Sequence, residues 1–317
     1  MPLFKVKSPG NVNAFNEFFA EISNFKVMET DGVTYDFLYF PELDAMSLNF
    51  QNAGFETYMV IPNLGNLFYI MLVHIALVIP HFILFLVARM VSKANRLKSK
   101  IANYVYWNGS IRFFMEGYFD FVMFALINFK MINWEITNED FWAVTLSNIL
   151  ASVLLILSLS LPIILIILYS TNLKNWQNEN FANRYGSFID GTAELKPNQS
   201  QWVILLIPIS FFVRRIAFCL TAVFWLEFLW GQVAIQIMTS CLMVIYLQWS
   251  RPLDSRFANN IETFNEVISM FTLYLLMCFS DFISDPMIRS LCGKAFIAVV
   301  CFYAVVHIFF LFHGVYQ

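Results

Sequence analysis

Charged residues are scarce in this sequence. Asp, Glu, Lys and Arg make up 13% of the 317 residues, against about 25% in an average soluble protein. Hydrophobic residues reach 59% and aromatic residues 18%, so the chain must place its surface in lipid, which excludes a soluble globular domain. Eleven Gly and ten Pro are too few for a collagenous or low-complexity chain. The net charge of -3 argues against nucleic acid as a partner.

Cysteine is absent from the first 218 residues, and the five cysteines that follow have no CxxC spacing. A disulfide-stapled ectodomain and a cysteine zinc site are therefore excluded. The chain also lacks a P-loop, a GxSxG elbow and an HExxH motif. These absences predict a protein that is not an enzyme and has no organic cofactor. The ligands that the sequence still allows are Ca²⁺ or another cation, and bound lipid.

Long apolar runs are what the sequence has instead. A membrane span needs roughly 20 mostly apolar residues, and each span must be helical because lipid cannot pair an open strand. The fold class predicted here is an all-α integral membrane protein, a bundle of about seven transmembrane helices (residues 59–317) behind a small N-terminal interfacial segment (residues 1–58). Pro208 is predicted to break the fourth span, so that it begins near Ile209. The seven stretches are residues 63–89, 110–129, 141–169, 202–229, 231–248, 264–283 and 293–313.

The N-terminal segment contains one amphipathic pattern. Apolar residues recur there at i, i+3, i+4 and i+7, with Asn16, Glu17 and Glu21 on the opposite side. The apolar positions are Phe15, Phe18, Phe19 and Ile22. Two interpretations stay open, a helix that lies on the membrane interface and a small helix that packs on the bundle.

Basic residues predict the orientation. Ten Lys and Arg residues follow the first, third and fifth stretches, whereas the loops on the other side carry three. By the positive-inside rule the N-terminus is outside and the C-terminus inside. The predicted location is the plasma membrane or the mitochondrial inner membrane, where the N-terminus would face the intermembrane space. The expected partners are the lipid bilayer and other membrane subunits or copies of the same chain.

Ionisable residues within the stretches are the candidate functional residues, because each is costly at membrane depth. Arg112, Glu116 and Asp120 are spaced at i, i+4 and i+8, so they share one stripe of a helix. Arg214 and Arg215 lie at a depth similar to that of Glu116. We expect Glu116 to pair with one of these arginines.

The sixth stretch opens with a second group of polar residues. Glu262, Asn265 and Glu266 lie within about one turn of each other, and an Asn is predicted to cap this helix. Both groups are predicted to converge near the inner surface. One interpretation is that they neutralise one another and fix the register of the helices. The other is that Glu116, Asp120, Glu262, Asn265 and Glu266 supply oxygen ligands for Ca²⁺, Mg²⁺ or a permeating cation.

Several segments resemble the TRP-like multi-spanning membrane region of large ciliate surface proteins and, more remotely, fungal TRP-like flavin-carrier-type proteins. These segments are GFETYMVIPNLG (54–65), SIRFFMEGY (110–118), RYGSFIDG (184–191), the pair Arg214-Arg215, and residues 251–281. The resemblance implies membrane residence and a channel or sensing role. The chain departs from that pattern because it lacks a Cys-rich ectodomain and because residues 281–292 are too few for a pore helix and filter.

The function expected from the sequence is that of a non-enzymatic polytopic membrane protein, a TRP-like cation channel, transporter or sensor. The alternative is a structural or accessory subunit of a large membrane complex, for which the mitochondrial inner membrane is the expected place.

Overall fold

The computed structural model describes residues 3, 6, 8–23, 43–55, 57–87, 101–102, 105–132, 141–172, 179–193, 200, 202–280 and 282–316. These residues form helices and contain no β-strand. The chain divides into two compact units. Unit 1 comprises residues 1–25, 47–54 and 220–317, and unit 2 comprises residues 26–46 and 55–219. Each unit is described by itself.

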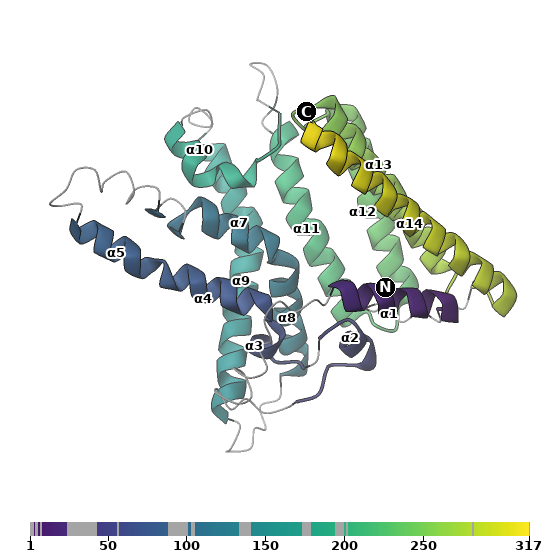
Figure 1. Cartoon of the computed structure of the whole chain (residues 1–317). Helices are drawn as coiled ribbons and strands as arrows, with labels where there is room; N and C mark the ends of the chain where they lie inside the picture. The colour runs from purple at the N-terminus through teal and green to yellow at the C-terminus, as the bar shows by residue number, and fades with distance from the viewer. Residues whose placement is uncertain are drawn as a thin grey trace. The chain divides into compact units, whose positions relative to one another are not determined.

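Unit 2 is built around one buried helix, α8, which packs on α9 and α3 (Figure 1). All but two of the residues from Tyr118 to Asn128 are buried, and the buried residues lie on every side of α8. This pattern is expected for a helix that is enclosed by its neighbours. The helices of unit 2 are α3 (Val60–Asn63), α4 (Asn66–Ala76), α5 (Val78–Val87), α7 (Asn108–Glu116), α8 (Tyr118–Met131), α9 (Phe141–Thr171), α10 (Glu179–Tyr185), the 3₁₀ helix η3 (Gly186–Phe188) and most of α11 (Trp202–Phe224).

Unit 1 is a helical hairpin with a third long helix beside it. Helices α12 and α13 are joined by a short turn and pack on each other, and α14 packs on α13 (Figure 1). The short α1 lies against α14. The helices of unit 1 are α1 (Gly10–Ser23), α2 (Leu48–Asn52), α12 (Leu229–Ser250), α13 (Arg256–Met277) and α14 (Pro286–Tyr316).

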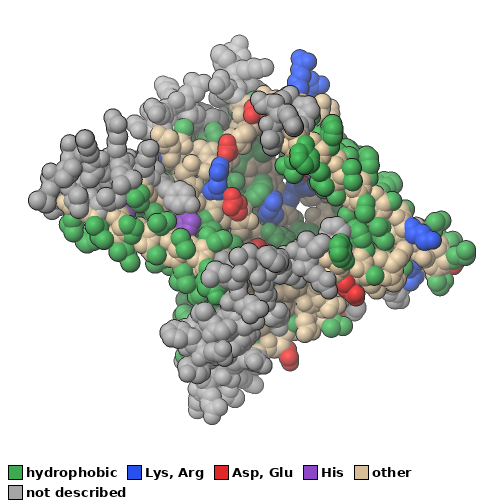
Figure 2. Space-filling model, in the orientation of Figure 1, with side chains coloured by type: hydrophobic (Ala, Val, Ile, Leu, Met, Phe, Trp, Pro, Cys, Tyr) green, Lys and Arg blue, Asp and Glu red, His purple; other side chains and the backbone are tan. Residues whose placement is uncertain are grey.

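Four helices of the described chain are long and apolar enough to cross a membrane, so the prediction of about seven spans is wrong in number. The stretches predicted at 141–169, 202–229, 231–248 and 293–313 are confirmed as long apolar helices. The helical segments that qualify are Trp142–Thr171, Trp202–Phe224, Leu229–Ser250 and Pro286–Phe312. At most one third of the apolar window of each is buried inside the chain, which suggests a lipid environment for their outward faces. Figure 2 shows apolar side chains over much of the visible surface of α14 and of α4 and α5.

The other three stretches differ for separate physical reasons. The first is interrupted at Leu77, between α4 and α5, and its apolar helical part, Leu67–Ile83, is too short to qualify. The second is divided into α7 and α8 at Gly117, whose missing Cβ leaves room for the ring of Phe121. The sixth forms the full-length helix α13, but its first turns are too polar to qualify.

Pro208 does not break the fourth stretch, contrary to the prediction. Helix α11 runs unbroken from Trp202 to Phe224 with Pro208 inside it. A proline removes one helical hydrogen bond and does not end a helix whose other residues are strongly apolar. The predicted interfacial segment before Ile209 is therefore part of the same helix.

Helix α1 is fixed to α14 at a glycine. The Val12 side chain is fully buried, and the Asn11 side-chain amide donates to the Ser290 carbonyl at 3.4 Å. A Cβ at Gly293 would lie 2.8 Å from both Asn11 Oδ1 and Pro9 Cγ. These contacts favour the interpretation of a small helix packed on the bundle for the first turn of α1. The side chains of Phe19, Glu21 and Ile22 lie outside the described residues.

Replacing Gly293 with leucine is expected to detach α1, because the added side chain would occupy the space of Pro9, Asn11 and Val12. Limited proteolysis of the protein in detergent should then remove the N-terminal segment faster than in the wild type. Gly10→Ala is the control, since a Cβ there meets nothing within 4 Å. Equal cleavage rates for Gly293→Leu and the wild type would contradict this docking.

Candidate functional sites in the two units

The predicted stripe of charged residues in unit 2 does not act as one cluster. Arg112 forms an ion pair with Asp190 at 2.7 Å, and both side chains are more than half exposed. Glu116 is exposed, and Asp120 lies beyond the break at Gly117 and is half-buried. Among the described residues Arg112 therefore finds its acidic partner in the segment 184–191, which the sequence analysis did not connect with it.

That segment is held on α7 by a second, better buried contact. The Ser187 backbone N–H donates to Asn108 Oδ1 at 2.9 Å, and the Ser187 hydroxyl also donates to Asn108. The Arg184 guanidinium lies 5.5 Å from the centre of the Trp107 ring, and Tyr185 meets the same ring edge-on. The RYGSFIDG segment thus closes over the beginning of α7 through hydrogen bonds and aromatic contacts.

Asn108→Ala is expected to destabilise the protein by about 1–3 kcal/mol, because the buried Ser187 N–H loses its acceptor. Arg112→Ala removes an exposed ion pair from the same interface and should cost no more than about 1 kcal/mol. Denaturant unfolding of both variants in detergent micelles measures the difference. A larger loss for Arg112→Ala would mean that the ion pair, not the asparagine, holds the segment.

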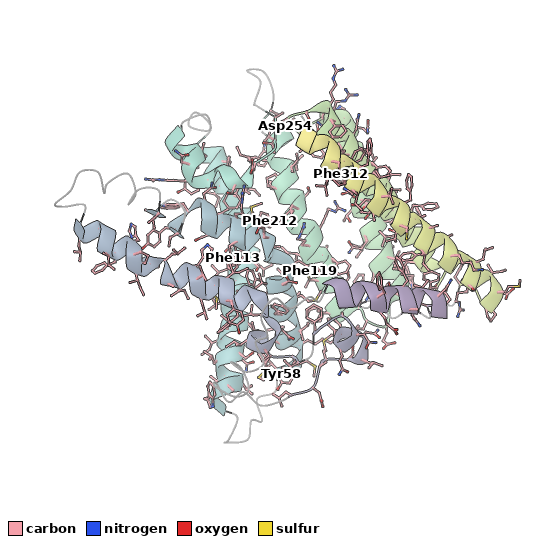
Figure 3. All side chains as sticks on the ribbon, viewed as in Figure 1. Tyr58, Phe113, Phe119, Phe212, Asp254 and Phe312 are labelled. Carbon is pink, nitrogen blue, oxygen red and sulfur yellow. The ribbon has the colours of Figure 1, made fainter. Side chains whose placement is uncertain are left out.

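The predicted pairing of Glu116 with an arginine of α11 stays a prediction, and the described contacts of Arg215 are different ones. The Arg215 guanidinium instead lies 3.4 Å from the centre of the Phe211 ring and donates to the Phe211 carbonyl. Arg214 is half-buried beside it. Aromatic side chains of α8 pack on α11 near this level, Tyr118 on Phe212 and Phe119 on Phe218 (Figure 3).

In unit 1 the turn before α13 is closed by Asn259, but the cap of the helix is Ser255. The Ser255 hydroxyl accepts the Ala258 N–H at 3.0 Å, so the prediction of an asparagine cap is wrong. The Asn259 amide donates to the carbonyls of Leu253 and Ser255 at 3.0 and 2.8 Å. Its oxygen accepts the Leu253 N–H at 3.2 Å. Asn259 thereby fixes where α13 begins and which side chains it presents to α12 and α14.

A hydrogen-bonded chain of three side chains connects α13 with α14. The Asn265 amide donates to Glu262 Oε2 at 3.1 Å, and Asn265 Oδ1 lies 2.8 Å from His307 Nε2. The amide nitrogen of Asn265 donates to the Glu262 carboxylate, so the group that faces His307 is the amide oxygen of Asn265. An amide oxygen can only accept a hydrogen bond, and His307 Nε2 is therefore the protonated ring nitrogen. Tyr303 packs 4.3 Å from the His307 ring. We call Glu262, Asn265 and His307 the α13–α14 relay.

Glu266 lies one turn beyond Glu262 and is the most buried carboxylate of the described chain, with 4% exposure. The Gln248 amide donates to the Thr263 hydroxyl at 3.1 Å across the hairpin, which places Glu266 level with position 245 of α12. The neighbouring Met243 and Leu247 of α12 are buried. Glu266 is therefore buried between α12 and α13, and an ionisable side chain is costly to bury at membrane depth.

The eight predicted site residues are divided between the two units. Arg112, Glu116, Asp120, Arg214 and Arg215 belong to unit 2, whereas Glu262, Asn265 and Glu266 belong to unit 1. The described residues contain no group of three or more His, Cys, Asp or Glu that could hold a metal ion. The oxygen-rich Ca²⁺ or Mg²⁺ site predicted from the sequence is thus not found within these ranges.

Two features were missed by the sequence analysis. His307 is one of four histidines in the sequence, and nothing in its spacing indicated that it bonds to Asn265. Gln232, Gln236 and Ser240 recur at every fourth position of an apolar helix and are all buried. That period was readable in the sequence.

Comparison of the chain with protein families, with curated proteins and with solved structures gives no match. The resemblance to TRP-like membrane regions therefore stays a prediction, and the function has to be argued from the geometry of the two units.

Proposed function

We propose that the chain is a non-enzymatic integral membrane protein of the TRP-like class that carries or senses cations through the acidic residues of α13. The observation that carries the proposal is the buried carboxylate of Glu266, one turn from the α13–α14 relay. Buried ionisable groups in membrane helices commonly belong to ion or proton pathways.

Helix α13 would be a fifth crossing beside the four apolar helices. It packs on both α12 and α14, and its 22 residues equal α12 in length. A helix of this length spans about 33 Å, enough for a hydrocarbon core of about 30 Å. If α12 and α14 cross the bilayer, their shared neighbour lies at the same depth, and Glu266 lies inside.

Five crossings would put the two termini on opposite sides, as the expected orientation requires. The inner loops after α9 and α12 would then carry five of the ten basic residues counted as inside, and the other five, Arg89 to Lys100, would lie on the side of the N-terminus. The N-terminus would be outside, or in the intermembrane space, and the C-terminus inside. The plasma membrane and the mitochondrial inner membrane are the proposed locations. The residues from Arg89 to Lys100 lie outside the described residues.

The test is whether the purified protein moves or binds cations. The protein in liposomes should dissipate an imposed gradient of H⁺, Na⁺, K⁺ or Ca²⁺ faster than empty liposomes. A sensor would instead show a melting temperature that depends on one of these ions. If neither effect occurs with any of the four ions, the cation proposal fails.

The second candidate function is that of a structural or accessory subunit, and α14 favours it. Only 6% of the apolar window of α14 is buried inside the chain, the smallest share among the four helices. A neighbouring subunit could cover this helix as well as lipid could. The mass of the complex purified under native conditions decides, because a subunit would elute with partners and a channel or carrier as one chain or its homo-oligomer.

A further inference from the structure

Three polar side chains follow one another along a single face of α12. Gln232, Gln236 and Ser240 have exposures of 0%, 9% and 2%. Four residues make about one helical turn, so the three side chains lie above one another at intervals of about 6 Å. We call them the α12 polar line. It occupies the half of the hairpin that lies away from the turn at Arg251.

The two glutamines leave complementary atoms unpaired. Gln232 Nε2 donates to the carbonyls of Thr221 and Trp225 at 3.0 and 2.6 Å, which fixes the orientation of the amide. Gln232 Oε1 and Gln236 Nε2 are buried and have no hydrogen-bond partner among the described residues. A buried polar atom without a partner costs about 1–3 kcal/mol. A water between these side chains would accept from Gln236 and donate to Gln232, so the spacing suits a single file of water.

Glu266 lies at the next level of the hairpin between the α12 polar line and the turn. The bond between Gln248 and Thr263 places Glu266 level with position 245, five residues from Ser240. The axial separation is about 7 Å, which one carboxylate side chain and one water can bridge. Beyond Glu266 the α13–α14 relay lies one turn nearer to the turn of the hairpin. Polar groups of α12, α13 and α14 therefore lie at successive levels along most of the hairpin.

We propose that the α12 polar line, Glu266 and the α13–α14 relay form a proton pathway through unit 1. This inference rests on the proposed function and names its cation. At each step one O–H or N–H bond breaks and another forms on the next oxygen or nitrogen, and the Glu266 carboxylate accepts a proton from one side and releases it to the other. Nothing is oxidised or consumed.

The chemistry of the line favours protons over metal ions. A permeating metal ion needs several oxygen ligands at each level to replace its hydration shell. The α12 polar line offers a single neutral amide or hydroxyl at each turn. A proton needs only one donor and one acceptor at each step, which these groups and water supply.

Gln236 is the position at which to test the pathway. In liposomes that enclose a pH-sensitive dye, a K⁺ gradient with valinomycin would drive proton entry through the wild type. Gln236→Leu should slow this entry by about tenfold, because leucine has no donor to hold the water. A tenfold change in rate corresponds to about 1.4 kcal/mol in the activation free energy. Gln236→Glu, which keeps a polar exchanging group, should retain the flux. Cys241→Leu is the control on the same helix, since Cys241 is exposed beside the α12 polar line.

Each result decides a separate point. If the wild type moves no cation and shows no ion-dependent melting, the proposed function fails and the pathway with it. If it moves Na⁺, K⁺ or Ca²⁺ but no protons, or if folded Gln236→Leu conducts protons like the wild type, only the pathway is overturned. Thermal melting and gel filtration show whether Gln236→Leu folds. If it does not fold, Ser240→Ala takes its place with the same expected loss and the same refuting result.

Discussion

Glu266→Gln is expected to reduce cation flux by about a hundredfold while the protein keeps its fold. A positioned group that takes up and releases a proton commonly contributes a factor of about 10²–10⁴, and glutamine keeps the shape but cannot exchange the charge. The fold should persist because glutamine has nearly the same shape as glutamate and a neutral amide costs less to bury than a carboxylate. Flux into liposomes and thermal melting, measured on the same preparations, test both parts.

Glu227→Gln is the matched control for this substitution. Glu227 is exposed in the short connection between α11 and α12, so its neutralisation should leave flux unchanged. A wild-type rate in Glu266→Gln would remove Glu266 from the ion path. A loss of flux that is equal in both variants would point to a general effect of charge, not to this buried site.

The sequence predicted the class of fold well because helices in lipid depend on length and apolarity alone. The stretches 141–169 and 293–313 are uninterrupted and were confirmed as α9 and α14. The predicted number of membrane spans was wrong where a single residue interrupts a helix. Interruptions at Leu77 and Gly117 divide two stretches into shorter helices, and an average of hydropathy over a window of residues shows neither of them.

The candidate site was harder to predict, because its residues acquire their roles from partners distant in sequence. Arg112 was expected to face the other charges of its helix and instead meets Asp190, 78 residues away. Asn265 was expected to act beside the carboxylates, and it does contact Glu262, but its oxygen faces His307, 42 residues further on. Periodicity predicts the face of a helix on which a residue lies. It does not predict which helix covers that face.

Ser147→Ala is expected to lower the stability of unit 2 by about 2–4 kcal/mol, because one hydroxyl satisfies two buried donors. Ser147 Oγ accepts the Val60 N–H at 2.9 Å and the Asn128 amide at 3.0 Å. The Val60 contact fixes the start of α3, within the segment GFETYMVIPNLG, to α9, and the Asn128 contact ties α8 to the same point. Alanine would leave the Val60 N–H and one Asn128 N–H without this acceptor.

Ser152→Ala on the same helix is the control. The Ser152 hydroxyl is exposed and donates to the Asn148 carbonyl within α9, so its loss should change stability by less than about 0.5 kcal/mol. Denaturant unfolding in micelles measures both variants. Equal stability of the two would mean that the start of α3 is held by its apolar contacts alone, namely Met59 and Ile61 against Ala143. The Ser147 hydroxyl would then contribute nothing to stability, and apolar packing would hold the segment 54–65 in place.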